Sequence, residues 1–276
     1  MNVPKSPFVA ALLVAACGAC FAAVQTPLVV DYETGTANSG ISGVIVTHAT
    51  APDAAYVVAD ARSGNYAIAH KVTLDDPAYV SNDAPRSESS SNLLTSSAGV
   101  YHNNTEAVYA FSLSLRDWQP STSGDEDILW QFKHNQGRHD IAIGLQRNAL
   151  MLHWNGNANR LALVRDVLAP GNSLSNRWID FRFRILWRND GTGWFVMDMR
   201  LPGETDYGHT VTRTGISTFD PTPGTGTFGY LKWGVYRNDG STANGDPATR
   251  IVYHDDIAAT QIDALFVDGF EAAATR

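Results

Sequence analysis

Short runs of alternating apolar and polar residues, separated by clusters of Gly, Asn, Asp, Ser and Pro, constrain this 276-residue chain more than any other feature. In "EAVYAFSLSL" (residues 106–115), Tyr109, Phe111 and Leu113 share one face of an extended strand, and small residues occupy the other. Successive side chains of a strand point to opposite faces, so such a run predicts a strand with one buried face. Neither an internal repeat nor a long helical segment is apparent. The pattern predicts an all-β protein built from two packed sheets.

The strand pattern predicts one domain, a β-jelly-roll sandwich of the concanavalin A-like lectin/glucanase type, over residues 24–262. Its two stacked antiparallel sheets should leave a concave groove on a polar face. The Ser-rich segment 81–99 is expected to be a loop or an irregular edge strand, and residues 263–276 form a separate C-terminal tail. Besides 106–115, strands are expected at 127–133, 139–145, 150–154, 177–187, 193–199, 230–239 and 249–262.

The N-terminus is typical of a secretory signal peptide over residues 1–23. One lysine precedes an apolar run at 8–16, which is followed by small residues. The run is too short to span a bilayer. The stretch "VAAC", which ends at Cys17, also resembles a bacterial lipobox, so a lipid anchor at Cys17 is the alternative to simple secretion or a periplasmic location. A buried N-terminal helix is disfavoured because the segment has neither caps nor a polar face.

Composition excludes several classes of function. Both cysteines, Cys17 and Cys20, lie in the signal segment, so the mature domain would have neither disulfides nor thiol catalysis nor cysteine–zinc sites. The formal net charge of −8 argues against nucleic acid as a partner. We therefore expect a monomer that is held together by its core.

Three stretches place unusual polar groups on strand faces: "PRSES", "WQFKHN" and "YLKWGVYRND". In the third stretch, apolar residues fill one face, while two phenols and a cation fill the other. An isolated polar residue on a strand is usually only solvated, but three such faces in one chain favour a binding site. The polar residues are Arg86 and Glu88 in the first stretch, Gln131 and Lys133 in the second, and Tyr230, Lys232 and Tyr236 in the third.

The order R-S-E, Q-x-K, Y-x-K-x-G-x-Y is similar to the three signature motifs of jelly-roll alginate lyases. The sequence around these motifs resembles glucuronan lyases and heparin-lyase-like polysaccharide lyases even more closely. The matching pieces are "ILWQFKHN", "RWIDFRFRILWRNDGTGWFVMDM", "YLKWGVYRND" and "VYHDDI". The resemblance covers roughly residues 27–260, and it implies a lyase that acts on an acidic polysaccharide.

The resemblance implies β-elimination, in which a base removes the C5 proton beside the carboxylate of a uronate. Arg86 and Gln131 would neutralise that carboxylate. Tyr236 would take the C5 proton, donate one to the leaving O4, or do both. A neighbouring cation such as Lys232 would favour the phenolate. The expected substrate contacts are Tyr230, Glu88, His102, His134 and Arg237.

Lys133 stands where the alginate lyase motif usually has a histidine that serves as a base from the opposite face of the ring. In β-linked glucuronate or mannuronate, the C5 proton and O4 lie on the same side, so one tyrosine suffices. We therefore count Lys133 in the catalytic set and expect glucuronan, or else mannuronate-type alginate. His102 or His139 would be the alternative source of a second base.

Two other functions fit the same fold. A glycoside hydrolase needs two carboxylates a few ångström apart. The chain offers Glu126 and Asp127, but Trp130 or Gln131 occupies the place of the second acid. A non-catalytic, lectin-like module would need the groove and its aromatic residues, but not Tyr236 specifically.

A structural Ca²⁺ is the one cofactor that the sequence suggests. "VVDYETG" near the start and "HDDI" near the end would be neighbouring strands, and their carboxylates are hard oxygen ligands. Related lyases often carry calcium at such a place. The alternative is that these are ordinary acids of turns and edges. The candidate ligands are Asp31, Glu33, Asp255 and Asp256.

Overall fold

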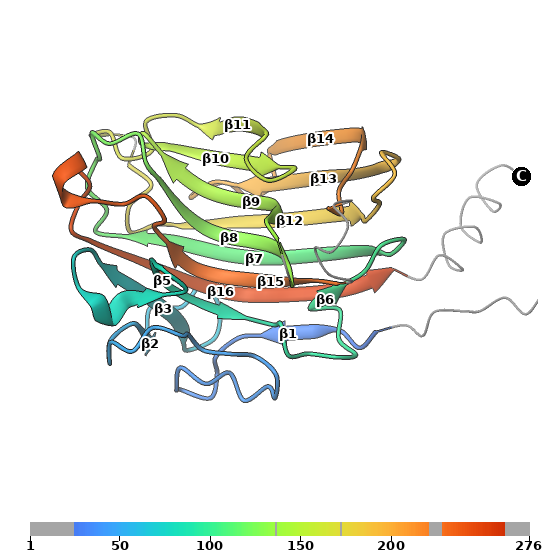
Figure 1. Cartoon of the computed structure of the whole chain (residues 1–276), viewed down its shortest axis with the longest axis horizontal. Helices are drawn as coiled ribbons and strands as arrows, with labels where there is room; N and C mark the ends of the chain where they lie inside the picture. Colours follow the sequence, from blue (N-terminus) through green and yellow to red (C-terminus); the bar gives the residue numbers. More distant parts are fainter. Residues whose placement is uncertain (1–24, 136, 172, 221–227, 263–276) are drawn as a thin grey trace, which may run out of the picture.

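The computed structural model describes residues 25–262, apart from 136, 172 and 221–227. The predicted signal peptide and the C-terminal tail lie outside the described residues. The chain forms two stacked antiparallel sheets whose strands run roughly along the long axis of the molecule (Figure 1). This arrangement confirms the predicted jelly-roll sandwich. Among the described residues, no helix has the length and apolar character that crossing a membrane requires.

We call the first sheet the front sheet. Its order is β11-β10-β9-β8-β15-β5-β4, and β6 pairs with β15. Every pairing between its strands is antiparallel. Its strands are β4 (Val80–Ser81), β5 (Ala84–Ser90), β6 (Val100–Tyr101), β8 (Glu126–His134), β9 (His139–Gln146), β10 (Ala149–Trp154), β11 (Asn159–Val164) and β15 (Gly229–Tyr236).

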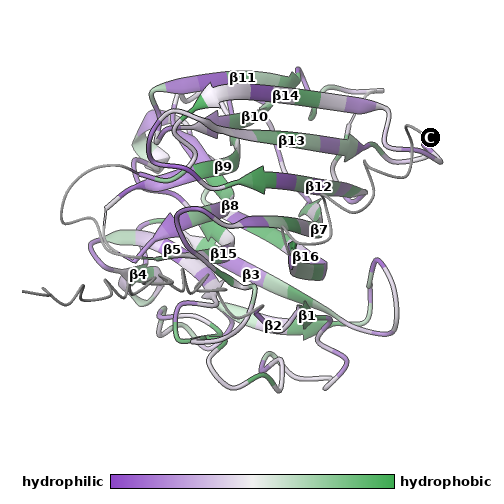
Figure 2. Cartoon of the chain, turned by 90° about the vertical axis from the view of Figure 1, so that its right-hand side faces the viewer, coloured by the Kyte–Doolittle hydropathy of each residue, from purple (hydrophilic) through white to green (hydrophobic). Residues whose placement is uncertain are grey.

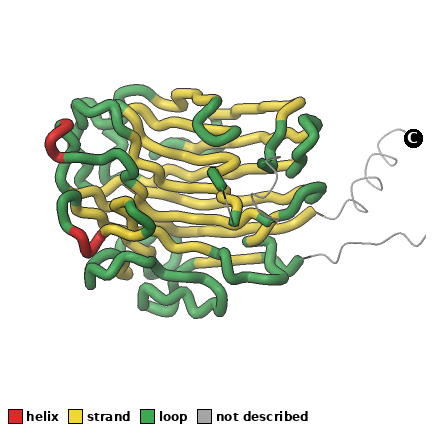
Figure 3. The backbone as a smooth tube through the Cα atoms, in the orientation of Figure 1, coloured by secondary structure: helices red, strands yellow, loops and turns green. Residues whose placement is uncertain are grey.

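The other sheet is the back sheet, with the order β14-β13-β12-β7-β16-β3-β2 and with β1 paired to β16. Two single-turn helices, η1 (Pro77–Tyr79) and η2 (Thr242–Asn244), lie at one end of the sandwich (Figure 3). The back strands are β1 (Leu28–Val30), β2 (Ala55–Val58), β3 (Ala67–Thr73), β7 (Glu106–Arg116), β12 (Trp178–Leu186), β13 (Gly193–Arg200), β14 (His209–Ile216) and β16 (Thr249–Ile262).

Aromatic side chains fill the space between the sheets. Phe111 of β7 stacks on Trp130 of β8 with ring centroids 3.8 Å apart, so this contact joins the two sheets. Phe181 of β12 lies 5.0 Å from Phe111. Hydrophobic and hydrophilic residues alternate along many strands (Figure 2). The apolar faces expected from the sequence are therefore the core faces.

Part of the Ser-rich segment is the expected edge strand. Residues 84–90 form β5, which pairs with β15 over residues 86–90 and with the two-residue β4 only at Ala84 and Pro85, so most of β5 lies at the edge of the sheet. Ser87 donates to the carbonyl oxygen of Ala54 at 2.5 Å, and Ser89 donates to that of Val46 at 2.7 Å. These bonds satisfy the buried hydroxyls, so polar serines can occupy an inward face.

Gly234 sets the contact between β15 and β5. Its φ of 146° is unfavourable for a residue with a side chain. A Cβ at this position would lie 2.2 Å from the carbonyl oxygen of Ser87 and 2.6 Å from Cα of Glu88. The missing side chain allows β5 to approach closely, and two residues later Tyr236 pairs with Arg86.

Candidate active site

A cleft of about 420 Å³ lies on the outer face of the front sheet. β5, β8 and β15 are adjacent strands in that sheet, so the three predicted motifs lie side by side. Four predicted catalytic residues line the cleft: Arg86, Gln131, Lys133 and Tyr236. The fifth, Lys232, pairs in register with Gln131.

Arg86 is the cation that acts on the Tyr236 phenol. Its guanidinium lies 4.1 Å from the centroid of the tyrosine ring. The phenol donates to Oδ1 of Asn238 at 2.6 Å. Burial raises the pKa of Tyr236, the Arg86 charge opposes this rise, and the Glu88 charge adds to it. The phenol is therefore held protonated near neutral pH, and Arg86 is the group that makes its ionisation easier.

Glu88 lies beneath the cleft and holds its polar residues together. Its side chain is 4% exposed, and its carboxylate accepts bonds from the Gln131 amide and the Lys232 ammonium. The Arg86 guanidinium is 4.0 Å away. Glu88 is thus enclosed by protein donors rather than presented to a ligand. Lys232 faces Glu88, so our expectation that Lys232 is the cation beside the phenol was wrong.

Lys133 lines the cleft, whereas its cross-strand neighbour Tyr230 does not. They are paired in register, and both side chains are half-buried. Burial lowers the pKa of the Lys133 ammonium, and the charge of Lys232 lowers it further. Burial, followed by the charge of Glu88, raises the pKa of Tyr230 to about 12. The ammonium of Lys133 donates to the carbonyl oxygen of Gly137, on the turn that borders the cleft.

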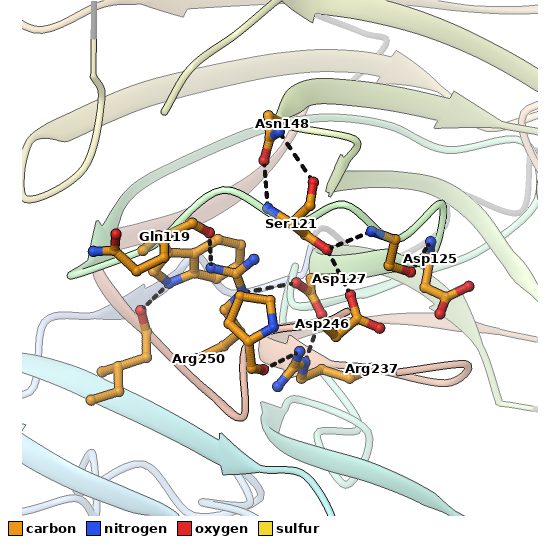
Figure 4. A network of polar contacts seen from close by, with 12 residues as sticks. Gln119, Ser121, Asp125, Asp127, Asn148, Arg237, Asp246 and Arg250 are labelled. Carbon is orange, nitrogen blue, oxygen red and sulfur yellow. Dashed lines mark hydrogen bonds and ion pairs between the residues drawn. The ribbon is translucent and has the colours of Figure 1, made fainter. Parts of the chain in front are cut away.

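Two expected substrate contacts are buried structural groups. His134 is fully buried, and its Nε2 lies 3.0 Å from the Asp140 carboxylate. Arg237 is fully buried and donates to Asp127 at 2.8 Å and to the carbonyl oxygen of Pro247 at 2.9 Å (Figure 4). Both predictions were wrong because each residue follows a cleft residue, and the strand alternation turns its side chain to the opposite face.

The acid pair considered for a hydrolase is split between two faces. Asp127 is buried between Arg237 and Arg250, with N–O distances of 2.8 and 3.2 Å (Figure 4). Glu126 lines the cleft, where its Oε1 is 2.7 Å from Nε2 of His153. The two carboxylates therefore do not flank one sugar bond, as hydrolysis would require.

The two histidines considered as alternative bases lie in different places. His102 borders an apolar pocket with Phe228 and is not part of the cleft lining. His139 does line the cleft. Burial, followed by the charge of His153, lowers the pKa of His139 to about 4, so it is neutral at neutral pH.

Several cleft residues were not among the predicted site residues. Arg138 and Asn157 lie outside the three motifs, Asn238 and Asp239 end the third motif, and all four come from turns between strands. Turns have no hydrophobic periodicity, so their sequence gave no sign that they would reach the cleft. Only the position of Asn238, two residues after Tyr236, could have indicated that a turn residue lies near the cleft.

The four acids proposed for calcium do not fit a metal ion. Glu33 Oε1 accepts the backbone N–H groups of Asn65 and Tyr66 at 2.7 and 3.0 Å. Asp255 Oδ2 accepts those of Arg62 and Ser63 at 2.8 and 3.2 Å. Within the described residues, no group of three or more His, Cys, Asp or Glu side chains could hold a metal. These carboxylates fix the loop at 62–66 instead.

The sequence pattern of the family described as "Polysaccharide lyase" matches residues 32–258. The chain belongs to the polysaccharide lyase family. It is therefore an enzyme that acts on a polysaccharide, as the resemblance implied. No curated protein sequence matches this lyase.

Solved structures of two lyases share the fold. One is the endo-β-1,4-glucuronan lyase of the fungus Trichoderma reesei, with a TM-score of 0.54 and 19% identity, covering 80% of this chain and 92% of that one. The other is the PL-14 alginate lyase of Aplysia kurodai, with a TM-score of 0.55 and 8% identity, covering 87% and 100%. At these identities the likeness of this lyase to them concerns the fold alone.

Proposed function

We propose that this lyase cleaves a β-1,4-linked polyuronate by β-elimination in the front-sheet cleft, with glucuronan as first substrate and mannuronate-rich alginate as second. One observation carries the proposal: the Arg86 guanidinium lies 4.1 Å from the Tyr236 ring in a cleft that Gln131 also lines. A carboxylate-binding cation, an amide donor and a phenol are the groups that uronate elimination requires.

The carboxylate of the sugar would be neutralised before its C5 proton is removed. Arg86 has a fork of N–H donors that suits a carboxylate. Gln131 gives one amide N–H to Glu88 and retains a second for the substrate. Together they would stabilise the negative charge that develops on the carboxylate when C5 loses its proton.

Tyr236 would move the protons. As a phenolate, it takes the C5 proton, and the electrons of that C–H bond form the C4–C5 double bond. The C4–O4 bond breaks, and O4 leaves with the proton that Tyr236 has just accepted. The phenolate is thus restored, and the products are a new chain end and a 4,5-unsaturated uronate.

Two observations favour glucuronate or mannuronate over guluronate. Lys133 occupies the place where a second base would stand, and its ammonium is bound to Gly137. His139 lines the cleft, but its pKa of about 4 makes it a weak base. An elimination that needs only one tyrosine fits this cleft best.

We also propose that the enzyme works as a monomer outside the cytoplasm. The apolar segment at 8–16 favours secretion. A polymer of uronates is too large and too charged to enter a cell unaided, so a lyase for it has to meet it outside.

A panel of glucuronan, alginate blocks, heparin, hyaluronan and a neutral β-glucan tests the proposal. Elimination on glucuronan should create far-ultraviolet absorbance from the C4–C5 double bond. Release of reducing ends without that absorbance would indicate hydrolysis. Binding without either signal would indicate a lectin-like module.

A further inference from the structure

A second hollow, of about 350 Å³, lies on the outer face of the back sheet. Trp178 and Asp180 of β12 and Arg200 of β13 contribute to it, while Gln131 and Tyr236 line the cleft on the front sheet. Both sheets therefore stand between the hollow and the cleft. The mechanism proposed above uses none of its residues.

A buried carboxylate arranges the cations of this hollow. Asp180, with a side chain 7% exposed, accepts two bonds from Arg62, at 2.8 and 3.0 Å. It also accepts from Arg200 at 2.7 Å. Asp255 holds the backbone N–H of Arg62 at 2.8 Å, which fixes the loop that carries it. Two guanidinium groups are thus held in place before any ligand binds.

Donors remain for an anion. Nη1 of Arg62 has no partner among the described residues. Arg177 is exposed, and within that part of the chain the only hydrogen bond of its guanidinium is to the carbonyl oxygen of Pro202, at 3.0 Å. Glu204 is already engaged by the Leu201 N–H and by His209. Among the residues that line the hollow, three guanidinium groups face two carboxylates, on a chain whose net charge is −8. The Asp255 and Asp256 carboxylates interact with the Arg62 segment but do not line the hollow.

The remaining lining is apolar. Trp178, Leu201 and Pro202 border the hollow beside Arg177. An indole and a proline ring offer flat surfaces for the C–H faces of a sugar. A carboxylate on that sugar would meet the guanidinium groups. This combination discriminates an acidic sugar from a neutral one.

We propose that this hollow is a second, non-catalytic binding site for a segment of the acidic polysaccharide. The identity of the ligand rests on the proposed function. Because the hollow and the cleft lie on opposite faces, the two bind different segments or different chains. A segment held at the back raises the local concentration of polymer at the cleft. The site therefore affects cleavage of long polymers and not of short oligomers.

The direct test follows the NMR signal of the Trp178 indole N–H. The probe is a hexamer of β-1,4-glucuronate, added to ¹⁵N-labelled Tyr236→Phe protein so that the hexamer is not consumed. The indole N–H signal of Trp178 is assigned by its loss in Trp178→Phe. We expect this signal to shift with the hexamer, not to shift with cellohexaose, and to stop responding in Arg177→Ala.

The kinetic test uses otherwise wild-type protein. Arg177→Ala should raise KM for the polymer by about tenfold with kcat unchanged, because one charged hydrogen-bonding contact is lost. Its kinetics on the hexamer should not change. Arg165→Ala is the matched control, since Arg165 is exposed and lines neither the hollow nor the cleft.

A Trp178 signal that stays in place at saturating hexamer, or that moves equally with cellohexaose, overturns the second site. An unchanged KM for the polymer in Arg177→Ala overturns its role in holding substrate. The Trp178 response is independent of catalysis. If glucuronan yields no unsaturated product while the signal still shifts, the second site stands and the proposed reaction fails.

Discussion

Among the single residues of the site, the cation beside the Tyr236 phenol determines how readily that phenol ionises. Arg86 stacks on the ring and lowers its pKa, whereas burial and Glu88 raise it. Because the raised pKa keeps the phenol protonated at neutral pH, the rate should rise with pH until Tyr236 ionises. Alkaline conditions should therefore favour the enzyme.

Arg86→Ala should lower kcat/KM for glucuronan by about 10²–10³-fold, because a group that stabilises developing charge is removed. It should also shift the ascending limb of the pH profile upward, since the phenol loses the charge that lowers its pKa. Profiles of kcat/KM against pH for wild type and Arg165→Ala provide the comparison. If the ascending limb of Arg86→Ala lies at the same pH as that of wild type, Arg86 does not affect the ionisation of Tyr236.

Lys232→Ala should also shift the ascending limb of the pH profile upward, but by less than Arg86→Ala. Lys232 neutralises Glu88, and an uncompensated Glu88 raises the pKa of Tyr236. The same pH profiles measure this shift, which should be smaller than that of Arg86→Ala. A larger shift would mean that Lys232 acts on the phenol directly.

Among the secondary-structure elements, alternation predicted two of the three strands that carry the site, β8 and β15, together with the back-sheet strands β7, β12, β13 and β16. The bounds of the edge strand β5 were not predicted, because its inward serines are satisfied by backbone carbonyls, which a polarity pattern cannot reveal. A register shift in β8 between Ile128 and Trp130 brings Glu126, not Asp127, to the side of Gln131. Bulges depend on tertiary packing, so the hydrophobic periodicity of the sequence does not predict them.

The close approach of β15 and β5 gives a stability prediction. Gly234→Ala should lower the free energy of unfolding by about 1–3 kcal/mol or more, because a Cβ would clash with Ser87 and Glu88. Urea denaturation followed by circular dichroism measures this. Gly208→Ala is the control, since nothing lies within 4 Å of its added Cβ. Equal stability of the two variants would contradict the close packing.

At the scale of the whole molecule, two histidines, His70 of β3 and His254 of β16, are fully buried between the sheets. Their ring centroids are 6.2 Å apart. Burial lowers the pKa of His70 to about 4. Burial, followed by the charge of His70, lowers that of His254 well below its usual value. The sandwich therefore has to enclose two neutral imidazoles, which protonate more easily in the unfolded chain.

The enzyme should lose stability as pH falls. The unfolded histidines take up protons near pH ~6.5, while His70 in the fold does so near pH 4, so the loss begins below 6.5. For His70 alone the full loss is roughly 3 kcal/mol. Urea unfolding at pH 7.5 and pH 5 measures it. His254→Leu should be less sensitive to pH, and an unchanged pH dependence in that variant would contradict the account.

The most direct test of elimination in the cleft is the rate at which folded Tyr236→Phe produces unsaturated uronate from glucuronan. The substitution removes one hydroxyl and leaves the core side of β15 unchanged, so urea denaturation should match wild type. We expect a loss of at least ~10⁴-fold in rate, because the same hydroxyl serves as base and acid. A soluble, folded Tyr236→Phe enzyme that forms the double bond at the wild-type rate would contradict the mechanism.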